Sequence, residues 1–349
     1  MSETPFINLQ LIADRAGVSR ATVSRALKNH PRISQSTIQR IKQIAAELGY
    51  RRDPHLADLM RHIRHRQSSL DRPVIALLLN QELPFEAPNV RGKSAMDGAW
   101  SRILESGYQP ELFNIAELAK QGRSASRILW SRGIQGVIVC PFQNPGLLTD
   151  FDWNHFSIVA IGYSIHNPFH RAATNHYQGL LDTINNLRSR GYQRIGGVVR
   201  NHINQQTHHY YHAAYLLKQE ELGCDTLLPA LVIDVNKPEW LDGEFKAWFG
   251  KYHPDAIITV PGMLEMIHEW LKEKKINIPH EVGLTSLQVD DNDTLTSGIR
   301  QNTFQVGCAA VDLLMSLLQT NEKGIPHSAR TVLVNGIWNE GQTTRPLIH

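Results

Sequence analysis

The chain has 349 residues, of which 42% are hydrophobic and 20% are charged. That length suits two or three domains, and the apolar fraction is enough to fill globular cores. No run of residues is long and apolar enough to predict a transmembrane helix, so no membrane partner is expected.

Charge is unevenly divided along the chain. Residues 1–66 contain twelve Lys and Arg residues against five Asp and Glu residues, whereas the remaining residues contain 24 basic and 28 acidic ones. A basic N-terminal segment predicts a polyanionic partner for that segment alone. The three cysteines, Cys140, Cys224 and Cys308, are scattered, and the N-terminus lacks an export signal, so a cytoplasmic location is expected.

Two short helices joined by a tight turn are predicted over residues 8–29. Leu9 and the apolar residues that follow it at spacings of three and four form one face of the first helix. Gly17 permits the left-handed backbone that a sharp exit from a helix requires. Ser19 can cap a second helix over residues 20–28.

The outward face of the second helix is predicted to carry arginine and small polar side chains, which suit the major groove of DNA. An ordinary amphipathic helix pair with a solvated basic face is the alternative. A third helix over residues 34–49 would close a three-helix headpiece. The outward-facing residues are Arg20, Ala21, Thr22, Ser24, Arg25 and Asn29.

A polar segment follows the headpiece. Asp53 and Pro54 indicate a helix start, and residues 56–63 place apolar side chains at helical spacing. This helix is too short to be stable alone. Residues 67–73 are expected to be a linker.

From Val74 onward, short apolar strands alternate with helices. Near-continuous apolar strands predict parallel sheets with both faces covered, and the number of units predicts an α/β body of two doubly wound lobes with a cleft between them. The predicted strands are residues 74–79, 110–115, 136–140, 157–162, 194–199, 228–233, 255–260, 281–287 and 331–336. The predicted helices are residues 89–106, 117–132, 175–190, 205–222, 238–252, 263–274 and 304–320.

The N-terminal residues resemble the headpiece of the lac repressor (LacI/GalR) family. The family's Ala-Gly-Val-Ser stands at residues 16–19, its Thr-Val-Ser-Arg at residues 22–25 and its Leu-Gly-Tyr at residues 48–50. The body is similar to the periplasmic-binding-protein-like core of the same family, with landmarks that include residues 191–196 and 298–302. The resemblance implies a transcriptional regulator, expected to be a repressor, that binds a palindromic double-stranded DNA operator as a homodimer.

The resemblance also implies where the chain divides. Crossings between the lobes are expected near residues 172, 300 and 331. The leucine-heptad tail of tetrameric members is absent after residue 345, so a dimer is expected. The expected segments are a helix-turn-helix headpiece (1–50), a hinge helix and linker (51–72), and an effector-binding and dimerisation core (73–349), with lobe one at about 73–172 and 300–330 and lobe two at about 173–299 and 331–349.

The family's base-reading positions are occupied here by Arg20, Ala21 and Arg25. Arginine can donate two hydrogen bonds to guanine, with plain phosphate contact as the alternative. Leu59 stands at the family's spacing for a leucine inserted into the minor groove, with a buried contact between hinge helices as the alternative. Arg52 replaces the usual hinge proline. Further DNA contacts, largely to phosphates, are expected from Leu9, Ser19, Thr22, Asn29 and Ser34.

Effector contacts that other members carry are replaced in this chain. Sugar- and purine-binding members have an arginine where this chain has Tyr211 and an aspartate where it has Gln288. Neither replacement supplies charge. A carbohydrate-like effector other than a simple hexose, or little response to any ligand, is therefore expected, unless Asp290 supplies the carboxylate in a shifted register. The candidate effector residues are Asn80, Arg91, Tyr211, Gln288 and Asp290.

No cofactor, metal or enzymatic site is predicted. His208 and His212 have the spacing of one helical turn, which can hold a metal, but no Cys, Asp or Glu follows before Glu220. The acidic run at residues 290–293 lacks the glycine and distal glutamate of a calcium loop. The sequence contains no glycine-rich phosphate loop and no G-x-S-x-G motif, so an enzyme is not expected.

Overall fold

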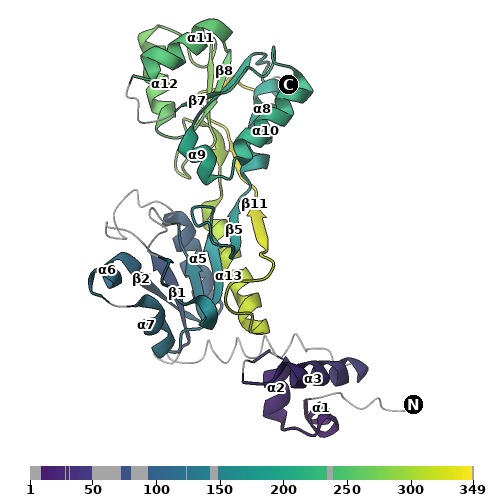
Figure 1. Cartoon of the computed structure of the whole chain (residues 1–349). Helices are drawn as coiled ribbons and strands as arrows, with labels where there is room; N and C mark the ends of the chain where they lie inside the picture. Colours follow the sequence, from purple (N-terminus) through teal and green to yellow (C-terminus); the bar gives the residue numbers. More distant parts are fainter. Residues whose placement is uncertain are drawn as a thin grey trace. The chain divides into compact units, whose positions relative to one another are not determined.

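The structure is a computed structural model that describes residues 9–27, 29–30, 32–48, 72–79, 93–122, 124–141, 148–233 and 239–347. These residues form three N-terminal helices and two separate α/β sheets with their helices (Figure 1). The chain divides into two compact units. The first comprises Met1–Ile161, Ile165–Ala172 and Gly307–Val332, and the second comprises Gly162–Ser164, Ala173–Val306 and Leu333–His349.

The three headpiece helices are α1 (Leu9–Ala16), α2 (Arg20–Leu27) and α3 (Gln35–Glu47). Gly17 separates the first two with a φ of 63°, the left-handed backbone that the sequence predicts. One small cluster of apolar side chains holds the helices together, which confirms the predicted three-helix arrangement. Its buried members are Ile12, Ala13, Ala16, Val23, Ala26, Ile38, Ile41 and Ala45.

A six-stranded sheet in the order β11-β5-β4-β3-β1-β2 forms the centre of the first unit. Its strands are β1 (Val74–Leu79), β2 (Gln109–Asn114), β3 (Gly136–Val139), β4 (Ser157–Ile161), β5 (His170–Thr174) and β11 (Thr331–Val334). The accompanying helices are α5 (Lys93–Glu105), α6 (Ile115–Lys120), α7 (Ala125–Ser131), the short 3-10 helix η3 (Trp153–His155) and α13 (Thr303–Thr320).

Both faces of this sheet are buried. A Cβ at Gly136 of β3 would lie within 3.3 Å of Leu314 and Leu318, so α13 covers that face. The adjacent residue Val137 turns to the other face and joins a cluster that includes Leu129 of α7. Burial of alternate residues against helices on opposite sides explains why the strands are apolar throughout.

A second six-stranded sheet, in the order β12-β10-β9-β8-β6-β7, forms the centre of the second unit. Its strands are β6 (Ile195–Arg200), β7 (Leu231–Ile233), β8 (Ala256–Thr259), β9 (Gly283–Ser286), β10 (Ser297–Arg300) and β12 (Ile337–Asn339). The helices are α8 (His176–Ser189), α9 (Asn201–Gln206), α10 (Tyr210–Leu222), a π-helical turn (Leu241–Phe245), α11 (Lys246–Tyr252) and α12 (Met263–Glu273).

Two adjacent glycines of β6 show how closely helices approach this sheet. A Cβ at Gly196 would collide with Trp248 of α11, and a Cβ at Gly197 would collide with Tyr215 of α10. Because neighbouring residues of a strand face opposite sides, α10 and α11 cover opposite faces. The predicted class, an all-α headpiece with a doubly wound α/β body, is confirmed.

Three strands were not predicted from the sequence. The first, β5, carries polar side chains at His170 and Arg171, yet all its residues are buried, so its composition conceals a strand. The others, β10 and β12, have four and three residues, which is too short for periodicity to reveal. Moreover, β12 pairs with β10 in the antiparallel direction, so this one edge of the sheet departs from the predicted parallel arrangement.

Two helices predicted as continuous are each divided. The helix expected over residues 117–132 is α6 and α7, separated by Gly122 at a φ of 65°. The helix expected over residues 205–222 is α9 and α10, separated by His208 and His209 at φ values of 51° and 60°. Left-handed backbone breaks a helix, and non-glycine residues give little sequence signal for it.

Close packing between α5 and α13 generates a stability prediction. A Cβ at Gly307 of α13 would collide with the backbone of Ala95 and Ala99 on α5. Gly307→Ala is therefore expected to lower the free energy of unfolding by about 1–3 kcal/mol, the usual cost of overpacking. Gly250→Ala in α11 is the matched control, because a Cβ there meets nothing within 4 Å. Urea denaturation should show Gly250→Ala unchanged or stabilised, and equal effects of the two variants would refute the predicted contact.

Candidate nucleic-acid interface and small-molecule site

The N-terminus of α2 is capped by its own hydroxyl groups. Ser19 Oγ accepts the backbone N–H of Thr22 at 3.1 Å and lies 2.8 Å from Thr22 Oγ1. The cap fixes the first turn of α2 and places both hydroxyls at its positive end, where an anion is stabilised. Two residues expected to contact phosphates are thus brought together.

The predicted base-reading residues share one exposed face of α2. Arg20, Ala21 and Arg25 are exposed, whereas Val23 and Ala26 on the opposite side are fully buried. Ala21 contributes only a methyl group to this face. Such a face can donate hydrogen bonds to guanine or to phosphate oxygens.

The start of α3 repeats this arrangement. Ser34 Oγ accepts the backbone N–H of Thr37 at 3.3 Å and is therefore the N-cap. Arg40, which the sequence analysis did not select, donates to the carbonyl of Ala16 at 3.2 Å and ties α3 to the end of α1. Only the three-dimensional contact identifies Arg40, because the residues are far apart in the sequence.

The remaining predicted DNA contacts occupy different surroundings. Leu9, the first residue of α1, is half-buried and packs against the headpiece core, so its side chain supports the fold. Asn29 is exposed after α2 with a φ of 54°. The pKa of nearby His30 is lowered, first by desolvation and then by the positive charges of Arg25 and Arg32. Leu59, Asn80 and Arg91 lie outside the described residues.

In the second unit, Tyr211 of α10 takes part in a buried chain of hydrogen bonds. Gln301 Nε2 donates to the Tyr211 hydroxyl at 3.1 Å, and that hydroxyl lies 2.9 Å from Nδ1 of His176. A neutral imidazole with an unprotonated Nδ1 can accept the phenol's own proton. Burial lowers the pKa of His176 to about 4 and so maintains that acceptor.

Gln301 also connects Tyr211 to the other candidate effector positions. Its Nε2 donates to the carbonyl of Leu287 at 2.9 Å, directly before Gln288. The side chains of Gln288 and Asp290 are exposed, whereas Tyr211 is buried. The structure therefore brings the Tyr211 and Gln288 positions together through Gln301. His176 and Gln301 were not selected as site residues from the sequence.

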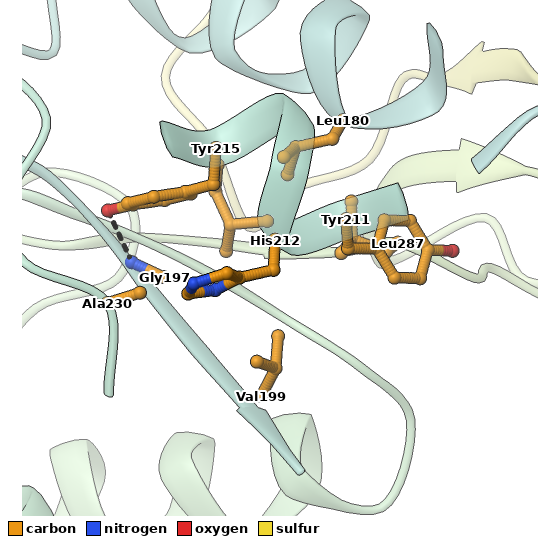
Figure 2. Close-up of a pocket in the computed structure, with 9 residues that line it drawn as sticks. Leu180, Gly197, Val199, Tyr211, His212, Tyr215, Ala230 and Leu287 are labelled. Atoms are coloured by element: carbon orange, nitrogen blue, oxygen red, sulfur yellow. Dashed lines mark hydrogen bonds between the residues drawn. The ribbon is translucent and has the colours of Figure 1, made fainter. Parts of the chain in front are cut away.

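A small cavity lies beside Tyr211 (Figure 2). Its volume is about 20 Å³, enough for little more than one water molecule and too small for a sugar ring. Tyr215 lines the same cavity and donates its hydroxyl to the carbonyl of Leu228 at 2.6 Å, while it accepts the N–H of Gly197. The lining residues are Leu180, Gly197, Val199, Tyr211, His212, Tyr215, Ala230, Ile258 and Leu287.

The histidine pair considered for metal binding does not lie on one helix. His208 precedes α10, and its left-handed backbone removes the helical spacing to His212. Across the described ranges, no group of three or more His, Cys, Asp or Glu side chains could hold a metal ion. No helix within those same ranges is long and apolar enough to cross a membrane.

Sequence comparisons identify two known domains in this chain. The family described as bacterial regulatory proteins, lacI family, matches residues 8–53, and a periplasmic binding protein-like domain matches residues 184–344. An uncharacterized HTH-type transcriptional regulator, YkvZ of Bacillus subtilis (strain 168), is 22% identical over 309 residues, which cover 86% of this chain and 88% of the relative. The HTH-type transcriptional repressor CytR of Escherichia coli (strain K12) is 24% identical over 188 residues, which cover 53% and 51% of the two chains.

Solved structures with a similar fold include several bacterial regulators. A periplasmic binding ribose operon repressor protein from Lactobacillus acidophilus has a TM-score of 0.56 at 19% identity and covers 80% of this chain and all of its own. The lac repressor dimer bound to operator and the anti-inducer ONPF has a TM-score of 0.54 at 16% identity, covering 97% and 99%. The transcriptional regulator CelR in complex with cellobiose has a TM-score of 0.53 at 16% identity, covering 97% and 100%.

The buried chain of hydrogen bonds at Tyr211 gives a second stability prediction. Tyr211→Phe leaves Gln301 and His176 without their shared hydroxyl, which is expected to lower the free energy of unfolding by about 1–3 kcal/mol. Tyr210→Phe is the matched control, because Tyr210 is 39% exposed. Denaturation of the full-length chain should separate the two variants. Indistinguishable stabilities would show that the Tyr211 hydroxyl contributes nothing.

Proposed function

We propose that this chain, which belongs to the lacI family of bacterial regulatory proteins, represses transcription by holding two headpieces on a palindromic operator. It is a DNA-binding transcriptional regulator with a periplasmic-binding-protein-like body. The observation that carries the proposal is the exposed face of α2, where Arg20, Ala21 and Arg25 lie together beside the capped helix N-terminus. We assign residues 1–50 to the headpiece, 51–72 to the hinge and 73–349 to the core.

Direct readout is assigned to the arginines of α2. Arg20 and Arg25 donate to base edges in the major groove, and Ser19, Thr22 and Ser34 hold phosphates at the starts of α2 and α3. Leu9 and Asn29 lie at the ends of the first two helices, and Leu59 is assigned to the minor groove. This division separates residues that set sequence preference from residues that set affinity and register.

A homodimer follows from the size of the headpiece. One helix-turn-helix module buries too little DNA surface for tight specific binding, and proteins of this class read paired half-sites. The dimer contacts are assigned to the body, so that the two headpieces reach half-sites about one helical turn apart. We further place the protein in the cytoplasm, where its DNA is, and assign its activity to binding and not to catalysis.

A small-molecule effector is assigned to the body, and a saccharide is the favoured class because similar folds include a regulator in complex with cellobiose. The contacts of Tyr211 support a ligand different from the hexoses and purines that other members bind. Its hydroxyl is already paired with His176 and Gln301, so a guest hydroxyl would have to displace one of them. Exposed Gln288 offers an uncharged amide. A larger or neutral saccharide, with contacts elsewhere including Asn80 and Arg91, fits these residues best.

The readout assignment is tested by paired alanine variants. Arg25→Ala is expected to weaken operator binding and to relax base preference at one position in each half-site, by about 1–3 kcal/mol. Lys42→Ala is the control, because Lys42 is exposed on α3 and is assigned no base contact. Binding of single-base operator variants, measured at fixed salt, should show the relaxation only for Arg25→Ala. Equal losses on operator and random DNA would reassign Arg25 to phosphate contact.

The effector assignment is tested by calorimetry against a panel of saccharides and nucleobases. Simple hexoses and purines are expected to bind weakly, because polar groups left unpaired in a closed site cost about 1–3 kcal/mol each. Asp290→Asn and Gln288→Ala distinguish the two possible registers. Tight binding of a common monosaccharide that is lost in Asp290→Asn and kept in Gln288→Ala would overturn the assignment of Gln288.

A further inference from the structure

The end of α1 needs donors from outside the helix, because the last backbone carbonyls of a helix have none within it. The backbone N–H of Gly17 donates to the carbonyl of Asp14 at 3.4 Å. The backbone N–H of Val18 donates to the carbonyl of Ala13 at 3.0 Å, and the half-buried Val18 packs against the headpiece core. These two bonds form a Schellman motif. The carbonyl of Ala16 remains available to a further donor.

The donor that reaches the Ala16 carbonyl comes from α3. Arg40 Nη2 donates to that oxygen at 3.2 Å. The next residue, Ile41, is fully buried in the headpiece core, so the backbone that carries Arg40 is held in place. A guanidinium at the C-terminal end of a helix also balances the partial negative charge there. Arg40 therefore fixes the end of α1 both by a hydrogen bond and by its charge.

The atom that Arg40 holds is close in the chain to the first base-reading residue. Only residues 17–19 separate Ala16 from Arg20. The first two form the Schellman motif, and the third caps α2 by accepting the backbone N–H of Thr22 at 3.1 Å. Because each of the three residues is constrained, a displacement at the end of α1 also displaces the first turn of α2.

The second base-reading residue depends less on this contact. Arg25 lies in the last turn of α2, between the buried side chains of Val23 and Ala26. Those two side chains belong to the headpiece core and hold that part of the helix directly. Loss of the Arg40 contact should therefore displace Arg20 more than Arg25.

We propose that Arg40 is a positioning residue for base readout, which holds Arg20 in register with the major groove without itself contacting DNA. This inference rests on the proposed function, in which Arg20 reads a base. Arg40 is exposed on α3, so a direct contact with phosphate is one competing role. A contribution to headpiece stability alone is the other. Only the positioning role changes the preference at the base that Arg20 reads.

Binding of the full-length protein to single-base operator variants, at fixed salt, tests this role. Arg20→Ala and Arg25→Ala first identify the base position that each arginine reads. Arg40→Met keeps the apolar stem and removes the guanidinium. It is expected to reduce the preference at the Arg20 position by roughly fivefold, the lower end of discrimination by a bidentate contact. The preference at the Arg25 position should change less than about twofold.

The readout is a ratio of affinities, so it remains valid if Arg40→Met unfolds part of the headpiece population. A smaller folded fraction lowers the affinity for every sequence by the same factor. Arg40→Lys retains a positive charge and a donor, and the contact with Ala16 uses a single nitrogen, so this variant should keep the preference within about twofold. Lys42→Met is the matched control, because it removes a positive charge from an exposed residue of the same helix. Its base preferences should equal those of the wild type.

Two further measurements separate positioning from direct contact. Each lost phosphate contact lowers the slope of log affinity against log salt by about 0.9, whereas Arg40→Met should keep the wild-type slope. The double variant Arg20→Ala/Arg40→Met should lose no more preference at the Arg20 position than Arg20→Ala alone, because Arg40 acts through Arg20.

The possible outcomes distinguish this inference from the proposed function. A lower salt slope with intact base preferences would assign Arg40 to phosphate contact and overturn the positioning role. Equal losses of affinity on every sequence, or no rescue by Arg40→Lys, would also overturn it. If Arg20→Ala itself relaxes no base position, the proposed readout by Arg20 is refuted, and the positioning role falls with it.

Discussion

The burial of Val23 and Ala26 against α1 and α3 is the interaction on which the proposed DNA interface depends. Both side chains are fully buried, and together with Ile12 and Ile41 they set the rotation of α2 about its own axis. That rotation decides which residues face outward. A headpiece core of so few side chains contributes modest stability. Helix caps and single contacts between helices therefore contribute a large share of the headpiece's stability.

In the second unit, the hydrogen bonds that a side chain already makes within the protein limit what it can bind. A buried hydroxyl that already accepts one hydrogen bond and donates another has little left for a guest. Tyr211 is in that condition, because Gln301 and His176 occupy it from two sides. The low pKa of His176 keeps the imidazole neutral. We therefore propose that contacts that the protein makes with itself help to set ligand selectivity in this unit.

Much of the fold could be predicted from the sequence because its signals are local. Gly17, the apolar spacing of α1 and the apolar strand β1 each report their structure within a few residues. The errors arose where distant contacts override composition. Polar β5 is a strand because its neighbours bury it, and the break before α10 uses left-handed histidines that no local pattern reveals.

The residues of the candidate sites also differ in how far the sequence predicts them. Arg20 and Arg25 could be selected because their faces follow from helical spacing and from a short motif. Gln301 and Arg40 could not, because each acts on a carbonyl or hydroxyl remote in the sequence. Spacing predicts which residues share a face, whereas only the folded structure shows which buried polar groups form hydrogen bonds with each other.

The most direct measurement of the central claim is selection of bound sequences from a pool of random duplexes by the full-length protein. Two identical headpieces that read bases through α2 predict a palindromic consensus of two half-sites, centred about one helical turn apart. The recovered pool should lose that consensus when α2 is altered at Arg20 and Arg25 together. Recovery of no consensus by the unaltered protein, or of a single half-site without a partner, would contradict the account.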